Sequence, residues 1–243
     1  MGFEGKRVLI TGASSGLGLA IAKRFLTEGA VVCGGGRREV CDLTAPAFTY
    51  LHGDITRPEA AEALVMESLK KMGGLDILVN CAGVTGVGGV LDTSPEEFRR
   101  QFEVNVFGLF YVKRAAVPAL MDGDGSTIIN VGSELGSRAK AGRIAYCPSK
   151  AAVEMLTRCL ALECAPNVRV NGVLPGLMDT PMTHERFVSE EKRRKVGEGY
   201  LLKRMCQVED VVEAVLFLSG KGSSFITGDL LAVCGGGQFY PTT

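Results

Sequence analysis

Long hydrophobic runs are missing from this sequence of 243 residues. No apolar stretch reaches the length of about 18 residues that crosses a bilayer as a helix. The first seven residues, Met-Gly-Phe-Glu-Gly-Lys-Arg, lead directly into a short apolar segment rather than a signal-peptide core, and position six is not the Ser or Thr of a myristoylation signal. We therefore expect no membrane partner.

An excess of charge is also missing, since 27 Lys and Arg residues balance 27 Asp and Glu residues. Nucleic acids and anionic membranes attract proteins with a broad positive field, which a balanced chain does not produce. The basic run at 192–195 follows two glutamates and is typical of a solvated helix. We expect no nucleic-acid partner, so any phosphate group must be recognised locally.

Disulfide and metal-ligand patterns are absent as well. The eight cysteines are scattered without a Cys-x-x-Cys pair and lie mostly in apolar runs, so we interpret them as free thiols of a protein in a reducing, cytoplasmic compartment. The two histidines, His52 and His184, are far apart and have no clustered cysteine or carboxylate partner. We therefore expect no metal site.

The sequence does contain a regular alternation of strand and helix patterns. Hydrophobic residues make up 46% of the chain and charged residues 22%, which is enough apolar material for one large core, and no change of composition marks a linker. Apolar runs typical of strands lie at 6–11, 29–33, 48–51, 76–80, 127–131, 167–174 and 225–234. The alternation of strand and helix patterns predicts an α/β fold. We expect one domain over 1–243, with a doubly wound, mostly parallel β-sheet and helices on both faces.

Local signals refine this prediction. Too few residues separate Arg38 from Asp54 for a full helix plus a strand, so we expect a shortened helix there. The segment 56–59 indicates a helix start with a capping box. Ser94, followed by Pro and two Glu residues, indicates a capped helix start.

Two polar side chains stand four residues apart at the start of a helical pattern. Tyr146 and Lys150 would share one helix face, and Pro148 fits a first turn because its missing N–H costs nothing there. An ammonium about 5–6 Å from a phenol favours the phenolate by about 3 kcal/mol at an effective dielectric constant of ~20, or about two pKa units. Such a tyrosine could exchange a proton near neutral pH, and Ser133 could bond the same substrate oxygen. Because Tyr-x-x-x-Lys pairs occur by chance in many helices, this hypothesis depends on the rest of the chain.

A glycine-rich turn joins the first strand pattern to the first helix pattern. The segment Gly-Ala-Ser-Ser-Gly-Leu-Gly at 12–18 lies between an apolar strand and a helix with apolar residues at Ile21, Ala22, Phe25 and Leu26. Glycines allow a pyrophosphate to approach the backbone closely, and the helix N-terminus meets its charge. The position of this turn favours a nucleotide-binding loop over a simple turn.

The spacing Thr-Gly-x-x-x-Gly-x-Gly at 11–18 resembles the cofactor loop of the short-chain dehydrogenases/reductases. Ser133, Tyr146 and Lys150 match the active-site pattern of that family, and Asn105 matches its fourth active-site residue. The resemblance covers nearly the whole chain, with the motifs in the right order. It implies a Rossmann-like fold and catalytic roles for Asn105, Ser133, Tyr146 and Lys150, with Asn105 supporting a water chain to the lysine.

The same resemblance implies a set of residues that bind a nicotinamide cofactor. The segment 80–83 departs from the family pattern only at Cys81, where the family has a second Asn. The implied cofactor contacts are Gly12, Ser14, Ser15, Gly16, Leu17, Gly18, Arg37, Arg38, Asp54, Ile55, Asn80, Ala82, Gly83, Tyr146, Lys150, Pro175, Gly176, Met178 and Thr180. Of these, the backbone of Met178 and the hydroxyl of Thr180 would bond the carboxamide.

The residues after the second strand pattern favour NADP(H) over NAD(H). NAD-dependent relatives carry an acid where this chain has Gly36, and Arg37 and Arg38 follow. An arginine accommodates the 2′-phosphate that an acid would repel. Two features weaken this preference: Ser15 stands where many NADP-dependent relatives have a second basic residue, and Glu39 follows closely.

We therefore expect an NADP-dependent carbonyl reductase or alcohol dehydrogenase, acting on a small-molecule carbonyl or alcohol. Alternatives within the enzyme class are a 3-oxoacyl-carrier-protein reductase, a sugar or dicarbonyl reductase resembling the L-xylulose reductases, and an NAD-dependent hydroxyl dehydrogenase. A non-catalytic NADP(H)-sensing protein on the same fold is the alternative from another class. By resemblance, a substrate lid is expected at about 183–200, and a homotetramer or homodimer through the helices at about 95–120 and 145–164.

Overall fold

Seven parallel strands form one sheet in the order β3-β2-β1-β4-β5-β6-β7. The computed structural model describes residues 2–183 and 189–237. The strands are β1 (Arg7–Thr11), β2 (Val31–Gly36), β3 (Phe48–His52), β4 (Ile77–Asn80), β5 (Ser126–Val131), β6 (Val168–Pro175) and β7 (Leu230–Val233). The order reverses between β1 and β4, which is the position where ligands bind in doubly wound sheets.

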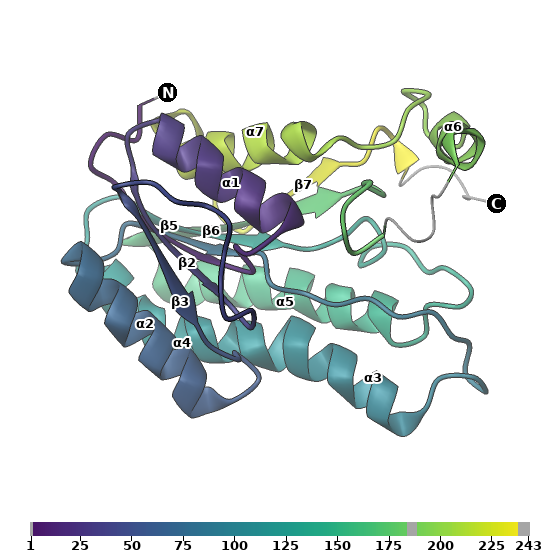
Figure 1. The fold of residues 1–243 in the computed structure, drawn as a ribbon, viewed down its shortest axis with the longest axis horizontal. Helices are drawn as coiled ribbons and strands as arrows, with labels where there is room; N and C mark the ends of the chain where they lie inside the picture. The colour runs from purple at the N-terminus through teal and green to yellow at the C-terminus, as the bar shows by residue number, and fades with distance from the viewer. Residues whose placement is uncertain (1, 184–188, 238–243) are drawn as a thin grey trace.

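Helices cover both faces of the sheet, as Figure 1 shows. The helical segments are α1 (Gly16–Thr27), α2 (Pro58–Met72), α3 (Pro95–Phe102), the π-helical η1 (Glu103–Gly108), α4 (Leu109–Met121), α5 (Tyr146–Cys164), α6 (Glu190–Glu198), α7 (Val208–Ser219) and the short 3-10 helix η3 (Lys221–Ser223). Helices α1 and α7 lie on one face, and α2, α4 and α5 lie on the other. The predicted single α/β domain with helices on both faces is confirmed.

Each face of the sheet has its own buried core. Ile10 of β1 packs in one cluster with Phe25 of α1 and Val215 of α7. Its neighbour Leu9 packs in the other cluster, with Leu64 of α2 and others. Because successive side chains of a strand point to opposite faces, a strand covered on both faces must be apolar along its whole length. This explains why the strand patterns are continuous apolar runs.

The segment between β2 and β3 differs from the prediction, because residues 37–47 contain no helix. The segment must return along the sheet from the end of β2 to the start of β3. An 11-residue helix rises only about 16 Å, whereas the six residues of β2 span about 20 Å. The connection is therefore irregular, with bends at 37–39 and 42 and a turn at 46–47.

Strand β2 also continues further than predicted, through the three glycines 34–36. Side chains would not fit there: a Cβ on Gly34 would lie 2.7 Å from the Ala13 Cβ, and one on Gly35 would lie 2.6 Å from a Leu64 methyl group. The glycines thus let the loop before α1 and helix α2 pack closely against β2.

The predicted helix starts had mixed outcomes. Ser94 caps α3, and its Oγ accepts a hydrogen bond from the Glu97 N–H at 3.2 Å, as expected. The capping box at Thr56 does not form, because the Thr56 hydroxyl donates to Asp54 Oδ1 at 2.9 Å and Arg57 is the N-cap of α2. Pro58 occupies the first helical position instead.

The continuous helical run Pro95–Met121 is long and apolar enough, by length and composition, to cross a membrane. Its buried residues Leu109, Val112, Ala116 and Leu120 pack instead against the core of one sheet face. We therefore interpret this run as a core helix of the fold.

Candidate active site

One cavity of about 660 Å³ opens beyond the carboxyl ends of the strands. Its wall is built from the glycine loop, the ends of β2, β4, β5 and β6, the start of α5, and α6 with the residues after it. Most of the sequence-predicted site residues line it: Gly12, Ser14, Ser15, Gly16, Leu17, Gly18, Arg37, Arg38, Asp54, Ile55, Ala82, Gly83, Ser133, Tyr146, Lys150, Pro175, Gly176, Met178 and Thr180. Asn80 and Asn105 do not.

The glycine loop is shaped for close backbone contacts. Gly12 has φ +73° and Gly16 has φ +54°, which favour glycine. A Cβ on Gly18 would lie 2.2 Å from the Gly12 carbonyl oxygen, so the helix can approach the loop only with glycine there. Ser15 is the N-cap of α1 and makes no side-chain capping bond. The first N–H groups of α1 therefore fit a pyrophosphate.

The far end of the cavity carries two arginines. The side chains of Arg37 and Arg38 are exposed and line the cavity just after β2. A Cβ on Gly36 would lie 2.7 Å from the Tyr50 hydroxyl oxygen, so an acid at position 36 would displace Tyr50. Asp54 Oδ1 accepts hydrogen bonds from the Thr56 N–H and hydroxyl at 3.0 and 2.9 Å. This end is suited to a negatively charged group.

Three predicted catalytic side chains share one part of the wall. Tyr146 begins α5, and Lys150 follows one turn later with its Nζ 6.0 Å from the centroid of the Tyr146 ring. Lys150 Nζ donates to the Val131 carbonyl oxygen at 2.9 Å, which fixes the ammonium at the end of β5. Ser133 follows β5, is 7% exposed, and its Oγ accepts from the Leu135 N–H at 3.2 Å.

The electrostatics differ from the sequence-based prediction for Tyr146. Burial raises the pKa of the phenol, while a hydrogen bond with Ser133 and the charge of Arg143 act in the opposite direction. Burial also lowers the pKa of Lys150 to about 8. The prediction considered the attraction between an ammonium and a phenolate at an effective dielectric constant of ~20 and left out the burial of the two groups. It was wrong about the net direction because both groups lose solvent.

Arg143 holds its charge near Tyr146 by bonds to the opposite wall. Its Nη1 donates to the Gly86 carbonyl oxygen at 2.7 Å and to the Thr85 hydroxyl at 3.2 Å. It lines the cavity one turn before Tyr146. Sequence analysis gave Arg143 no catalytic role, because the loop that holds it is nearly 60 residues away in the chain.

Asn80 lies behind the cavity wall. It is fully buried in β4, and its Nδ2 donates to Asn130 Oδ1 at 3.1 Å inside the sheet. Asn130 in turn donates to the Thr157 hydroxyl at 2.9 Å. Asn80 Oδ1 has no hydrogen-bond partner among the described residues, and its predicted contact with the cofactor stays a prediction. The neighbouring Cys81 lines the cavity instead.

Asn105 lies behind the cavity wall rather than on it. Its Oδ1 accepts from the Val84 N–H at 2.8 Å, and its Nδ2 donates to the Val84 carbonyl oxygen and the Ser149 hydroxyl, both at 3.0 Å. A Cβ on Gly83 would lie 3.3 Å from Asn105 Oδ1 and 3.6 Å from Lys150 Nζ. Asn105 thus fixes the loop after β4 beside the lysine.

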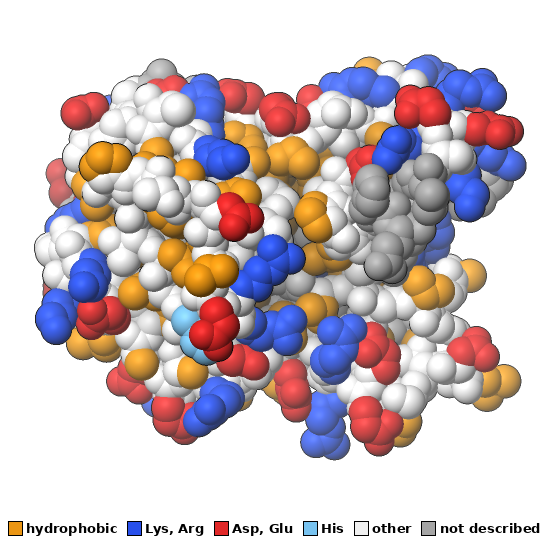
Figure 2. Space-filling model, in the orientation of Figure 1, with side chains coloured by type: hydrophobic (Ala, Val, Ile, Leu, Met, Phe, Trp, Pro, Cys, Tyr) orange, Lys and Arg blue, Asp and Glu red, His pale blue; other side chains and the backbone are white. Residues whose placement is uncertain are grey.

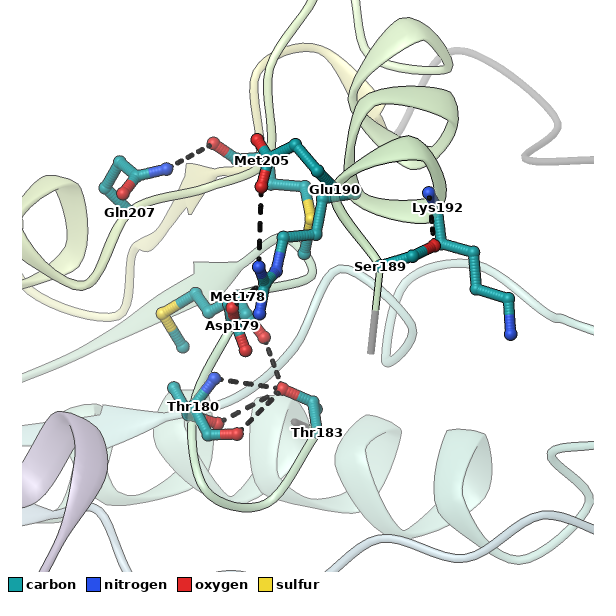
Figure 3. Close-up of polar contacts among 10 residues, drawn as sticks. Met178, Asp179, Thr180, Thr183, Ser189, Glu190, Lys192, Met205 and Gln207 are labelled. Carbon is teal, nitrogen blue, oxygen red and sulfur yellow. Dashed lines mark hydrogen bonds and ion pairs between the residues drawn. The ribbon is translucent and has the colours of Figure 1, made fainter. Parts of the chain in front are cut away.

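The atoms predicted to bind a carboxamide are bonded to Thr183 here (Figure 3). The Thr183 hydroxyl donates to the Met178 carbonyl oxygen at 2.5 Å, and its Oγ1 accepts from the Thr180 N–H at 3.1 Å. The hydroxyls of Thr180 and Thr183 lie 3.3 Å apart. A ligand amide that binds the Met178 carbonyl oxygen and the Thr180 hydroxyl would therefore share these atoms with Thr183 or displace it.

The predicted lid contains α6, which lines the cavity with Lys192, Lys195 and Val196. Residues 184–188 of that prediction lie outside the described residues. Arg193 Nε lies 2.8 Å from Asp179 Oδ2, which ties α6 to the loop after β6. In Figure 2 the α6 region forms a lobe at the upper right whose surface is mostly charged.

A buried polar pair connects the lid to the Ser133 loop, and sequence analysis did not predict it. Tyr200, 2% exposed, donates its hydroxyl hydrogen to Glu134 Oε1 at 2.9 Å and accepts from the Leu177 N–H at 2.8 Å. Burial raises the pKa of Glu134. The only sequence signal was an acid directly after Ser133, which by itself indicates nothing about its partner.

Comparisons with known proteins identify relatives of this chain. The chain matches the family model described as enoyl-(acyl carrier protein) reductase over residues 12–238. It is 37% identical to the meso-2,3-butanediol dehydrogenase of Serratia marcescens, over 97% of this chain and 96% of that protein.

Solved structures show the same similarity. The ligand-free aldohexose dehydrogenase of Thermoplasma acidophilum has a TM-score of 0.93 at 32% identity, covering 99% of this chain and 97% of that one. The 3-ketoacyl-(acyl-carrier-protein) reductase of Brucella melitensis, complexed with NADH, has a TM-score of 0.86 at 34% identity, covering 97% and 99%.

The chain belongs to the short-chain dehydrogenase/reductase family. It is an oxidoreductase of the CH–OH group that uses a nicotinamide dinucleotide.

Proposed function

We propose that this protein is an NADP(H)-dependent carbonyl reductase or alcohol dehydrogenase. The observation that supports this most strongly is that Ser133, Tyr146 and Lys150 line the same cavity as the glycine loop and the two arginines. When bound, the cofactor supplies or accepts the hydride. The rest of the chemistry is proton transfer and positioning by the chain.

In the direction of carbonyl reduction, Tyr146 donates its phenolic proton to the carbonyl oxygen. Burial raises its pKa, so the phenol is protonated near neutral pH and ready to donate. The Ser133 hydroxyl orients the same oxygen. Lys150 and Arg143 provide positive charge that stabilises the phenolate after the transfer. Asn105 is a positioning residue, since it holds the Val84 backbone and Ser149.

Each group of residues in the cavity wall would hold one part of the cofactor. The glycine loop and the N-terminus of α1 would hold the pyrophosphate, and Asp54 and Ile55 the adenine. Lys150 would bind the nicotinamide ribose. Met178 and Thr180 would bind the carboxamide, sharing these atoms with Thr183 or displacing it.

The preference for NADP(H) rests on Arg37 and Arg38. Both are exposed at the cavity, where a guanidinium can bond a 2′-phosphate through two N–H groups. Gly36 supports the preference, since an acid there would meet the Tyr50 hydroxyl. Replacing Arg37 with Asp should shift the ratio of kcat/KM values from NADPH toward NADH. An unchanged ratio would remove the argument for Arg37.

An NAD-dependent hydroxyl dehydrogenase is the second candidate. A relative of known structure, the Brucella melitensis reductase, is complexed with NADH. Titrating the protein with NADPH and with NADH, and following cofactor fluorescence, decides between the two candidates. Tighter binding of NADH would favour the second.

The substrate class follows from a carbonyl panel monitored by NADPH absorbance. The relatives are named for a diol, an aldohexose and a 3-ketoacyl carrier substrate, so the panel should contain a diketone, a sugar and a 3-oxoacyl thioester. Turnover with any of them supports the enzyme. Binding of NADPH without oxidation of any substrate would favour a non-catalytic sensor instead.

We also propose that the protein forms a homodimer or homotetramer in the cytoplasm. Exposed apolar side chains on the helices expected to pair support the assembly: Phe107 and Phe110 are 46% and 43% exposed, and Met155 and Leu162 are 57% and 84% exposed. The eight cysteines are all free thiols, which suits a reducing compartment. Sedimentation velocity tests the assembly, and a purely monomeric species at micromolar concentration would contradict it.

A further inference from the structure

Arg37 and Arg38, at the expected adenosine end of the cavity, belong to a segment without regular secondary structure. Residues 37–47 contain no helix, so no helical hydrogen bonds hold the backbone of Arg37 and Arg38 in place. Near the arginines, the Tyr50 hydroxyl donates to the Arg38 carbonyl oxygen at 3.0 Å, and Cys41 Sγ lies 3.7 Å from the Ala13 carbonyl oxygen. Further along the segment, Leu43 packs against a core cluster, and the Ala47 carbonyl oxygen accepts from the Val32 N–H at 2.9 Å.

Tyr50 reaches this segment from the neighbouring strand β3. Its backbone pairs with Gly34 of β2, and its side chain extends toward the end of that strand. A Cβ on Gly36 would lie 2.7 Å from the Tyr50 hydroxyl oxygen and 3.5 Å from Ser14 Oγ. The hydroxyl is therefore surrounded by the end of β2, the glycine loop and the Arg38 carbonyl group. Burial raises the pKa of the phenol, so it stays a hydrogen-bond donor.

We propose that Tyr50 is a positioning residue for cofactor selectivity: by bonding the Arg38 carbonyl oxygen, its hydroxyl holds the Arg37–Arg38 pair where the two guanidinium groups meet a 2′-phosphate. This inference rests on the proposed preference for NADP(H). Gly36, the last of the three glycines of β2, contributes to the same arrangement, because it leaves room for the hydroxyl. Tyr50 itself does not line the cavity, so it acts through the residues that its hydroxyl contacts. One of these is Ser14 of the glycine loop, which serves both cofactors, whereas the contact with Arg38 concerns the 2′-phosphate alone.

Replacing Tyr50 gives one binding result if the residue only stabilises the local structure and another if it positions the arginines for NADPH. NADH and NADPH share every group except the 2′-phosphate. Damage to the sheet edge or the glycine loop would weaken the binding of both cofactors. Displaced arginines would weaken the binding of NADPH alone. The ratio of the two dissociation constants therefore isolates the positioning role.

The test compares NADPH and NADH binding to the full-length protein by isothermal titration calorimetry. The variants are Tyr50→Phe, which removes the hydroxyl, and Gly36→Ala, whose methyl group would push the hydroxyl away while keeping the phenol. Tyr111→Phe is the matched control, because Tyr111 lies on α4 and contacts Phe110 away from the cavity. Both test variants should weaken NADPH about tenfold, the effect of one lost hydrogen bond, and change NADH less than twofold.

The outcomes separate the two proposals. An equal loss for both cofactors in Tyr50→Phe, or no loss at all, overturns the positioning role while the preference of the wild-type protein for NADPH stands. A wild-type protein that binds NADH as tightly as NADPH refutes the cofactor preference, and the inference falls with it. If Tyr50→Phe does not fold, the Gly36→Ala ratio decides alone.

Discussion

The buried Lys113 gives the sharpest prediction about stability. This residue of α4 is 1% exposed, and its Nζ has no hydrogen-bond partner among the described residues. Burial lowers its pKa from 10.5 to about 7. An uncompensated lysine in a protein core is costly, because burial disfavours the charged form.

Replacing Lys113 with Met should stabilise the fold. At about 1.4 kcal/mol for each pKa unit, the difference between 10.5 and about 7 corresponds to an upper limit of about 5 kcal/mol. Methionine has a similar length and no charge, so it should fit the same space. Local relaxation and water entry reduce the effect, and we expect a gain of at least about 2 kcal/mol at pH 6.5.

The sign of the pH dependence follows from linkage. Between pH 7 and 10.5 the unfolded chain holds a proton on Lys113 that the folded chain does not, so wild-type stability from this group rises with pH. The Met variant lacks this pH-dependent contribution to the free energy of unfolding. Its advantage should therefore shrink between pH 6.5 and pH 9.5, by at most about 3 kcal/mol if the full pKa shift applies.

Urea denaturation followed by circular dichroism measures this effect, since the chain has no tryptophan for fluorescence. Lys71→Met is the control: the Lys71 side chain is 50% exposed and pairs with Glu67 on the surface, so its replacement should change little at either pH. A Lys113→Met variant no more stable than wild type at pH 6.5, or one whose advantage persists at pH 9.5, would refute the reasoning.

Three further predictions concern the fold and the site. Asp76→Asn breaks the ion pair with Arg7, whose Nε lies 2.8 Å from Asp76 Oδ2. It should lower the free energy of unfolding by about 2–3 kcal/mol at pH 7. Urea titration curves that superimpose on those of the wild type would contradict this. Tyr200→Phe removes the hydroxyl that bonds the Leu177 N–H and the Glu134 carboxyl. It should lower the free energy of unfolding by about 2 kcal/mol. Thermal unfolding checks this, and an unchanged melting temperature would count against a stabilising role of the Tyr200–Glu134 pair. Thr183→Val removes the hydroxyl bonded to the Met178 carbonyl oxygen. It should tighten NADPH binding by about two- to fivefold. Weaker binding in a calorimetric titration would show instead that Thr183 contributes to cofactor binding.

The sequence predicted the parts of the site that depend on local geometry. Tyr146 and Lys150 share a face because they are one helical turn apart, and the glycine loop is recognisable between a strand and a helix. Both features lie on continuous segments. The doubly wound parallel sheet with helices on both faces followed from the alternating pattern.

Features that depend on distant packing were not predictable. Tyr200 and Glu134 are 66 residues apart and meet only because the lid folds over the Ser133 loop. Asn80 turned into the sheet because Asn130 on the next strand offered a partner. The pKa of Tyr146 depends on burial, which no spacing rule gives. The absent helix at 37–47 reflects the distance between two strand ends, which the sequence does not state.

The central claim is that the Tyr146 hydroxyl transfers the proton in the reaction. It is tested most directly by Tyr146→Phe, with NADPH affinity measured by fluorescence titration and turnover measured by NADPH absorbance on one accepted substrate. The account predicts NADPH affinity within about twofold of wild type and a loss of kcat of at least about a thousandfold. A variant that keeps a tenth of the wild-type activity would contradict it.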